Sequence, residues 1–142
     1  MAASAKPEWV SRPPHAGDVV TCLYPNDPKG RLRPCLVLEV LTGSSGGFSV
    51  RVAYGTKSLD KATRGNIDLI VESDSDMNEC GVPVPTRFDL ETTATIPWEP
   101  PDCDCWRGFY SPVLGELPKN QQIDCAHKLQ AIQNKPRRQL TK

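Results

Sequence analysis

Residues 33–53, RPCLVLEVLTGSSGGFSVRVA, decide the fold. Their first nine residues form the most apolar run of the chain, and its length, its β-branched residues and a proline confined to its start predict a central β-strand. The glycines and serines of residues 43–47 predict a turn. Residues 48–53 then alternate between apolar and polar, so the phenylalanine and the two valines should share one face of a second strand. We expect these two strands to pair as a hairpin.

Shorter strand signals lie on both sides of this hairpin. Residues 18–23 (DVVTCL) and 68–71 (DLIV) are typical of strands, and residues 86–96 offer one or two more. The acidic stretch around residues 73–78 is expected to be a loop. Pro97 and the two prolines that follow it should end the sheet, because proline cannot donate to a strand ladder.

One convincing helix signal follows the sheet. Leu117-Pro118 places a proline at the first helical position, and Cys125, Leu129 and Ile132 recur at the spacing of one buried helical face. Pro136 should end this helix. Because it lies on the apolar stripe, Cys125 is expected in the core rather than in a reactive site.

The chain has 142 residues, enough for one domain with one core. Residues 1–16 are irregular and rich in proline and should form a flexible arm, residues 17–134 the domain, and residues 135–142 a loose basic tail. Fourteen prolines and ten glycines suit short strands joined by turns better than a helical bundle. The predicted fold class is therefore β-rich, with a C-terminal helix.

The distribution of apolar residues and cysteines indicates in which cellular compartment the protein is expected. No apolar run approaches the ~20 residues needed to cross a bilayer, and residues 1–10 lack the apolar stretch of a signal peptide. We therefore expect a cytoplasmic protein without a membrane partner, in which the six cysteines are favoured as free thiols. Only Cys103 and Cys105 lie close together, and His15 and His127 stand apart, so no metal site is predicted. Zinc bound by the cysteines stays open as an alternative.

The net charge is zero, yet charge is segregated along the chain. Residues 1–67 carry nine Lys and Arg against five Asp and Glu, residues 68–104 carry one against ten, and residues 105–142 carry seven against two. If the two basic segments meet on one face, they can hold a phosphate backbone. The acidic segment would then either face solvent or bind a basic partner.

Three segments carry a family resemblance through their order and spacing. They are Gly17-Asp18-Val19-Val20, Arg33-Pro34-Cys35-Leu36-Val37-Leu38 and Val50-Arg51-Val52-Ala53-Tyr54-Gly55-Thr56. Together they resemble the MazF/PemK (Kid-like) toxin family, in which a G-D-x-V strand leads through a substrate loop to an R-P-x-L-V-L strand and a later strand ends in a threonine. Looser similarity extends over about residues 16–134. The resemblance implies an SH3-like β-barrel, as in MazF and CcdB, with a C-terminal helix.

The resemblance also implies a function. It predicts a metal-independent endoribonuclease without cofactors, the toxin of a type II toxin–antitoxin system. Such an enzyme cleaves single-stranded RNA by attack of a ribose 2′-hydroxyl on the adjacent phosphate, which leaves a 2′,3′-cyclic phosphate. A homodimer and an antitoxin protein are the implied partners. The alternative is a non-catalytic interaction module on the same barrel, such as a phage-borne protein or an inhibitor of a host enzyme, because a fold does not fix a function.

This reaction needs a cation where charge grows on the phosphoryl oxygens, a donor that fixes the phosphate, and acid–base help. Arg33, at the start of a buried strand, is expected to supply the cation, because a guanidinium can fork onto two phosphate oxygens. The family pattern assigns Thr56 as the donor and Glu91 as the acid–base partner. Contacts with RNA are predicted for Lys29, Arg31, Lys57 and Arg64 on the backbone and for Tyr54 on a base.

Two features set this chain apart from the family pattern. The loop between Leu23 and Arg33 is shorter than usual, and Leu32 stands where a histidine commonly precedes the Arg-Pro pair. The family uses this loop to touch substrate, so no RNA motif is predicted. Residues 98–106 (WEPPDCDCW) are a further addition without a predicted role.

Overall fold

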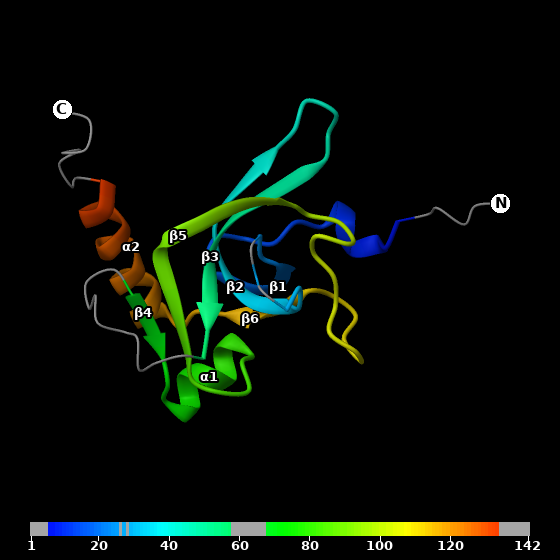
Figure 1. The fold of residues 1–142 in the computed structure, drawn as a ribbon. Coiled ribbons are helices and arrows are strands. Elements are labelled where there is room, and N and C mark those ends of the chain that lie inside the picture. Colours follow the sequence, from blue (N-terminus) through cyan, green and yellow to red (C-terminus); the bar gives the residue numbers. More distant parts are fainter. Residues whose placement is uncertain (1–5, 26, 28, 58–67, 134–142) are drawn as a thin grey trace.

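The structure, a computed structural model, describes residues 6–25, 27, 29–57 and 68–133. Its elements are, in chain order, the 3₁₀-helix η1 (Glu8–Ser11), β1 (Asp18–Leu23), β2 (Leu32–Thr42), β3 (Phe48–Thr56), β4 (Asp68–Val71), α1 (Asp74–Cys80), β5 (Thr86–Pro97), β6 (Val113–Glu116) and α2 (Lys119–Gln133). The strands form one antiparallel sheet in the order β4-β5-β3-β2-β1-β6 (Figure 1). The predicted β-rich fold with a C-terminal helix is therefore confirmed. Within the described ranges, no helix is long and apolar enough to span a membrane.

The central hairpin forms as predicted. β2 pairs with β3, with Thr42 opposite Phe48 beside the turn and Cys35 opposite Tyr54 towards the far end. The valines of β3 are fully buried, whereas Arg51 between them reaches the surface and pairs with a glutamate of β2. This register matters for function because it brings the start of β2 next to the end of β3.

Two apolar cores lie on opposite faces of the curved sheet. Neighbouring residues of one strand alternate between them: Val19 and Leu36 belong to one core, and Val20 and Val37 to the other. The first core is completed by residues of α1, α2 and β5. It includes Cys125, as the spacing in α2 predicts. The second core is completed by Trp9 of η1 and by Trp98, which directly follows β5.

The sheet curls until its two edges come near each other. Helix α1, which joins β4 to β5 at one edge, contacts β6 at the other edge (Figure 1). The contact needs glycine at position 81, which caps α1 with φ 75° and where a Cβ would lie 2.2 Å from the backbone oxygen of Leu114. No strand pairing joins β4 to β6 among the described residues, so the sheet is curled without a closing ladder.

The N-terminal segment packs on the sheet, which differs from the expectation of a loose arm. Trp9 is 8% exposed and meets Trp98 edge-on, with ring centroids 5.0 Å apart. The indole N–H of Trp98 donates to the backbone oxygen of Trp9 at 2.9 Å. The described part of the arm, from residue 6, is therefore attached to the second core. Local sequence could not show this, because the partner lies 89 residues away.

Two local predictions are wrong. The acidic stretch after β4 forms α1 rather than a loop, because the Ser73 hydroxyl accepts the Asp76 N–H at 3.1 Å and acidic residues occupy the first turn. The sheet also does not end at Pro97, since β6 pairs with β1 farther along the chain. β6 is only four residues long, too short for a clear alternation.

Candidate phosphate-binding pocket

The pairing of β2 with β3 positions the candidate site. Cys35 lies opposite Tyr54, and the same antiparallel register continued by two residues places Arg33 opposite Thr56. On its other side β3 pairs with β5, where Thr56 lies opposite Arg87. Arg33 and Thr56 are thus carried by adjacent ends of hydrogen-bonded strands. Side chains on such elements are held more accurately than side chains on loops.

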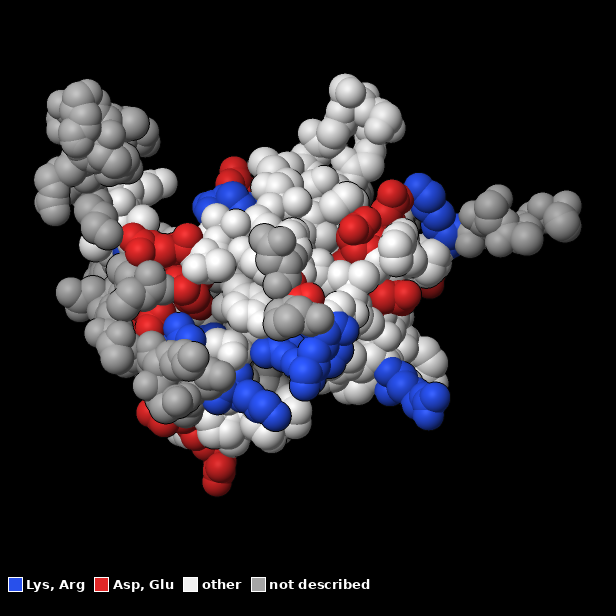
Figure 2. All heavy atoms as spheres, in the orientation of Figure 1, with Lys and Arg blue, Asp and Glu red and all other residues white. Residues whose placement is uncertain are grey.

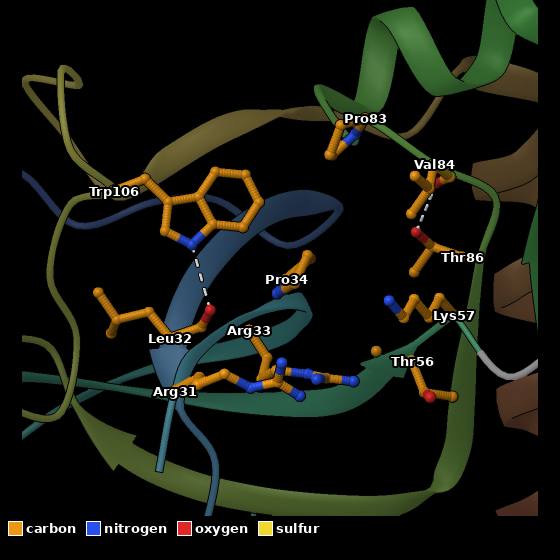
Figure 3. A pocket seen from close by; sticks show the side chains of 11 residues that line it. Arg31, Leu32, Arg33, Pro34, Thr56, Lys57, Pro83, Val84, Thr86 and Trp106 are labelled. Carbon is orange, nitrogen blue, oxygen red and sulfur yellow. Dashed lines mark hydrogen bonds between the residues drawn. The ribbon is translucent and has the colours of Figure 1, made fainter. Parts of the chain in front are cut away.

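A pocket of about 600 Å³, counting its open mouth, lies at these strand ends. It is lined by Arg31, Leu32, Arg33, Pro34, Gly55, Thr56, Lys57, Pro83, Val84, Thr86 and Trp106 (Figure 3). In Figure 3 the two arginine side chains extend in the direction of Thr56 and Lys57, and the Trp106 ring lies on another side of the pocket. Four of the predicted site residues, Arg31, Arg33, Thr56 and Lys57, therefore share one pocket.

Arg33 is half-buried and held against an aromatic ring. Its guanidinium carbon lies 5.6 Å from the centroid of the Tyr54 ring, close enough for a cation–π attraction. Its Nε is buried and has no hydrogen-bond partner among the described residues. A buried donor without a partner costs about 1–3 kcal/mol.

Tyr54 supports Arg33 from a neighbouring cluster. Its hydroxyl donates to Oδ1 of Asp27 at 3.1 Å, and its ring packs on Tyr24 with centroids 4.8 Å apart. Burial raises the pKa of Tyr54, and burial raises the pKa of Tyr24 to about 12, so both rings stay neutral at physiological pH. The N–H of Arg31 donates to Asp27 and lowers the pKa of that carboxyl. Base stacking by Tyr54 stays a prediction.

The remaining predicted cations are distributed unevenly. Arg31 and Lys57 are exposed at the pocket, whereas Lys29, also exposed, precedes β2 and does not line it. Arg64 lies outside the described residues. On the face in Figure 2, Lys and Arg gather over the lower centre, where β2 begins and β3 ends in Figure 1, while most Asp and Glu lie around them.

The structure does not bring Glu91 to the Arg33 pocket. On β5 the register shifts: Ala53 lies opposite Thr93 but Tyr54 lies opposite Asp89, so residues 90–92 bulge out of the ladder. Glu91 is exposed there and lines a different cavity, between β5 and α2. Its predicted acid–base role has no geometric support at Arg33. No carboxylate or histidine is among the described residues that line the pocket.

The buried thiols of Cys22, Cys80 and Cys125 do not supply an alternative nucleophile. Burial raises the pKa of Cys80 to about 12 and that of Cys125 to about 11, so both thiols stay protonated at neutral pH. Hydrogen bonding to Cys103, whose Sγ lies 3.4 Å away, is the main cause that raises the pKa of Cys22. Across the described part of the chain, no group of three or more His, Cys, Asp or Glu side chains is placed to hold a metal ion.

Trp106 is the pocket residue that sequence reasoning missed. Its indole N–H donates to the backbone oxygen of Leu32 at 3.1 Å, which fixes the ring beside the start of β2 (Figure 3). Trp106 thus brings an aromatic side chain to the start of β2 from a distant part of the chain. The signal that could have found it is the run Trp106–Tyr110, WRGFY, which interleaves three aromatic residues with an arginine.

Fold and site together define a curved antiparallel sheet with an open cationic pocket at the ends of two paired strands. No family model matches the chain, and no curated protein matches it either. Function is therefore inferred from the geometry of the Arg33 pocket. The resemblance to the MazF/PemK family stays a prediction.

A substitution at Gly55, which lines the pocket, tests how tightly the backbones of β2 and β3 are packed there. A Cβ at this position would lie 2.2 Å from the backbone oxygen of Pro34 and 2.9 Å from the Phe88 ring. A backbone oxygen cannot swing aside, so Gly55→Ala should force β2 and β3 apart. We expect the free energy of unfolding, measured by urea denaturation, to fall by about 1–3 kcal/mol. Gly47→Ala is the matched control, because nothing lies within 4 Å of its added Cβ. Equal stability of the two variants would contradict the packing described here.

Proposed function

We propose that this chain is a MazF/PemK-type endoribonuclease that holds one phosphate of single-stranded RNA in the Arg33 pocket and cleaves the strand there. The observation that carries the proposal is the convergence of Arg31, Arg33 and Lys57 with the Thr56 hydroxyl in one pocket. Guanidinium groups recognise phosphate through forked, charge-assisted hydrogen bonds.

The curled sheet also supports the proposed SH3-like barrel. Its six strands are antiparallel, and α1 brings the two edges close to each other. A homodimer, an antitoxin protein and a cytoplasmic location belong to the same proposal and rest on the resemblance alone.

In the proposed reaction the ribose 2′-oxygen attacks the adjacent phosphorus and the bond from phosphorus to the 5′-oxygen breaks. The products are a 2′,3′-cyclic phosphate and a 5′-hydroxyl. Arg33 neutralises the charge that grows on the non-bridging oxygens, and Thr56 donates its hydroxyl to one of them. Because no carboxylate or histidine is among the described lining residues, the 2′-hydroxyl proton passes to water and water protonates the leaving oxygen. The pocket accelerates the reaction by charge stabilisation and positioning.

A second candidate function is a non-catalytic interaction module that binds through the same pocket. One observation favours it: Glu91, the predicted acid–base partner, lines another cavity. General acid–base catalysis typically contributes 10²–10⁴-fold to a rate, so a pocket without it is better suited to binding than to fast cleavage. This module would retain phosphate binding but leave the strand intact.

Incubation of the purified protein with a long single-stranded RNA in EDTA tests the proposal. We expect discrete fragments that end in a 2′,3′-cyclic phosphate, because the nucleophile is the substrate's own hydroxyl. Single-stranded DNA of the same sequence is the control and should stay intact, since it lacks that hydroxyl. Intact RNA that shifts in a native gel would favour the binding module. RNA that is neither cut nor bound would reject both functions.

A further inference from the structure

A group of exposed aromatic side chains adjoins the Arg33 pocket and takes no part in the proposed reaction. Trp106 lines the pocket, and in the same loop Phe109 is 47% exposed and Tyr110 is 97% exposed. Aromatic side chains carry a large apolar surface that folding usually buries. Two exposed rings in the loop that supplies a wall residue of the pocket indicate a surface that meets a ligand.

The loop that carries these rings is tied to the sheet at both ends. The N–H of Leu23 donates to the oxygen of Asp102 at 2.8 Å, and the N–H of Thr21 donates to the oxygen of Pro112 at 3.0 Å. Both donors belong to β1. The aromatic tip is therefore presented by a fixed scaffold, which reduces the entropy lost when a ligand binds.

Two of the three rings, those of Trp106 and Phe109, are also ordered relative to one another. Trp106 is fixed by its hydrogen bond to Leu32, and Phe109 meets it edge-on, with centroids 6.0 Å apart and an interplanar angle of 80°. The N–H of Phe109 donates to the oxygen of Trp106 at 2.9 Å and closes the turn between them. Arg107, exposed in this turn, adds a cation to the aromatic tip.

We infer that Trp106, Phe109 and Tyr110 form a stacking surface for the bases of the single-stranded RNA whose phosphate occupies the Arg33 pocket. The inference rests on the proposed function and extends it to the neighbouring nucleotides. Aromatic rings beside a cationic groove are the combination that single strands need, since bases stack on the rings while phosphates bind the cations. The exposed rings alone could also bind a protein partner. The cations Arg31, Arg33 and Lys57 in the adjoining pocket favour a nucleic acid, because they can bind its phosphate backbone.

This surface selects single strands without selecting sequence. Every base has a π-face that can stack on an aromatic ring, whereas the bases of a duplex already stack on one another. Phe109 and Tyr110 are the rings to test, because both are exposed and neither lines the pocket, whose wall residue Trp106 is held by its own hydrogen bond to Leu32.

Fluorescence anisotropy with two short 2′-O-methyl oligonucleotides tests the inference. Neither strand can be cleaved, and one of them has abasic sites in place of its bases. The wild type should bind the base-containing strand more tightly than the abasic strand by roughly 5- to 100-fold. The double variant Phe109→Ala/Tyr110→Ala should lose most of this preference and bind the abasic strand as the wild type does. Ile123→Ala, which removes an apolar side chain that is 55% exposed on α2, is the matched control and should change neither affinity.

The outcomes separate this inference from the proposed function. If the wild type binds neither strand, the proposed function fails and the inference fails with it. If the double variant binds the base-containing strand as tightly as the wild type, only the stacking inference is wrong, and the rings are left as a contact surface for a protein. An equal loss of affinity for both strands in the double variant would also overturn the stacking inference, because stacking cannot explain weaker binding of an abasic strand.

Discussion

Replacement of Arg33 with alanine should slow RNA cleavage by about 100- to 1,000-fold, the cost of removing one group that stabilises transition-state charge. Arg33 is the half-buried cation of the pocket, it is faced by the Tyr54 ring, and its buried Nε has no hydrogen-bond partner in the described structure. The effect should appear in kcat, since the interaction strengthens as charge grows on the phosphoryl oxygens. Single-turnover cleavage of a labelled RNA measures it.

Two further variants sharpen this test. Arg33→Lys keeps the charge but loses the fork of donors, so we expect it to recover only part of the lost rate. Lys119→Ala removes an exposed cation at the start of α2 that does not line the pocket, and it should stay within a few-fold of the wild type. If Arg33→Ala folds normally and cleaves RNA at the wild-type rate, the proposed role of Arg33 is wrong.

Trp98→Ala should produce the largest loss of stability, about 3–5 kcal/mol in the free energy of unfolding. The Trp98 side chain is 1% exposed in the second core, and it both packs on Trp9 and donates to its backbone oxygen. Its removal leaves a cavity and deprives the N-terminal segment of its attachment to the sheet. Since domains of this size are stable by only about 5–15 kcal/mol, the variant should unfold at much lower urea concentration.

The matched variant is Trp98→Phe, which keeps an aromatic ring and removes the indole N–H. We expect it to cost less than the alanine variant because a smaller cavity remains. Trp9→Ala should destabilise the chain through the same contact. Urea midpoints of Trp98→Ala and wild type that agree within experimental error would show that this contact does not hold the N-terminal segment.

The hairpin and the first strand could be predicted because their signals are local. The apolar run after Arg33 and the alternation from Phe48 are properties of adjacent residues. In the structure Val50 and Val52 of β3 are buried on either side of the partly exposed Arg51, whereas β2 is buried on both faces of the sheet over Cys35–Val37. Arg33 and Thr56 were assigned from the family pattern, and it is the register of β2 with β3 in the structure that brings them together. Arg31 and Lys57 directly flank these two strands and line the same pocket.

The features that sequence reasoning missed depend on contacts between distant segments. Trp106 reaches Leu32 across 74 residues, and nothing near Trp106 in the sequence indicates that partner. Glu91 was assigned by its position in a family pattern, yet a bulge in β5 displaces it from the ladder. A bulge adds residues to one strand without any change of composition, so a register counted from sequence fails beyond it.

The most direct test of the central proposal is a crystal structure of the protein with a short 2′-O-methyl oligoribonucleotide, which keeps the phosphates and removes the attacking hydroxyl. We predict one phosphate within hydrogen-bond distance of the Arg33 guanidinium and the Thr56 hydroxyl, with neighbouring bases on the side of Trp106. A strand bound on another surface, for example over the cavity that Glu91 lines, would contradict the assignment of this pocket to RNA.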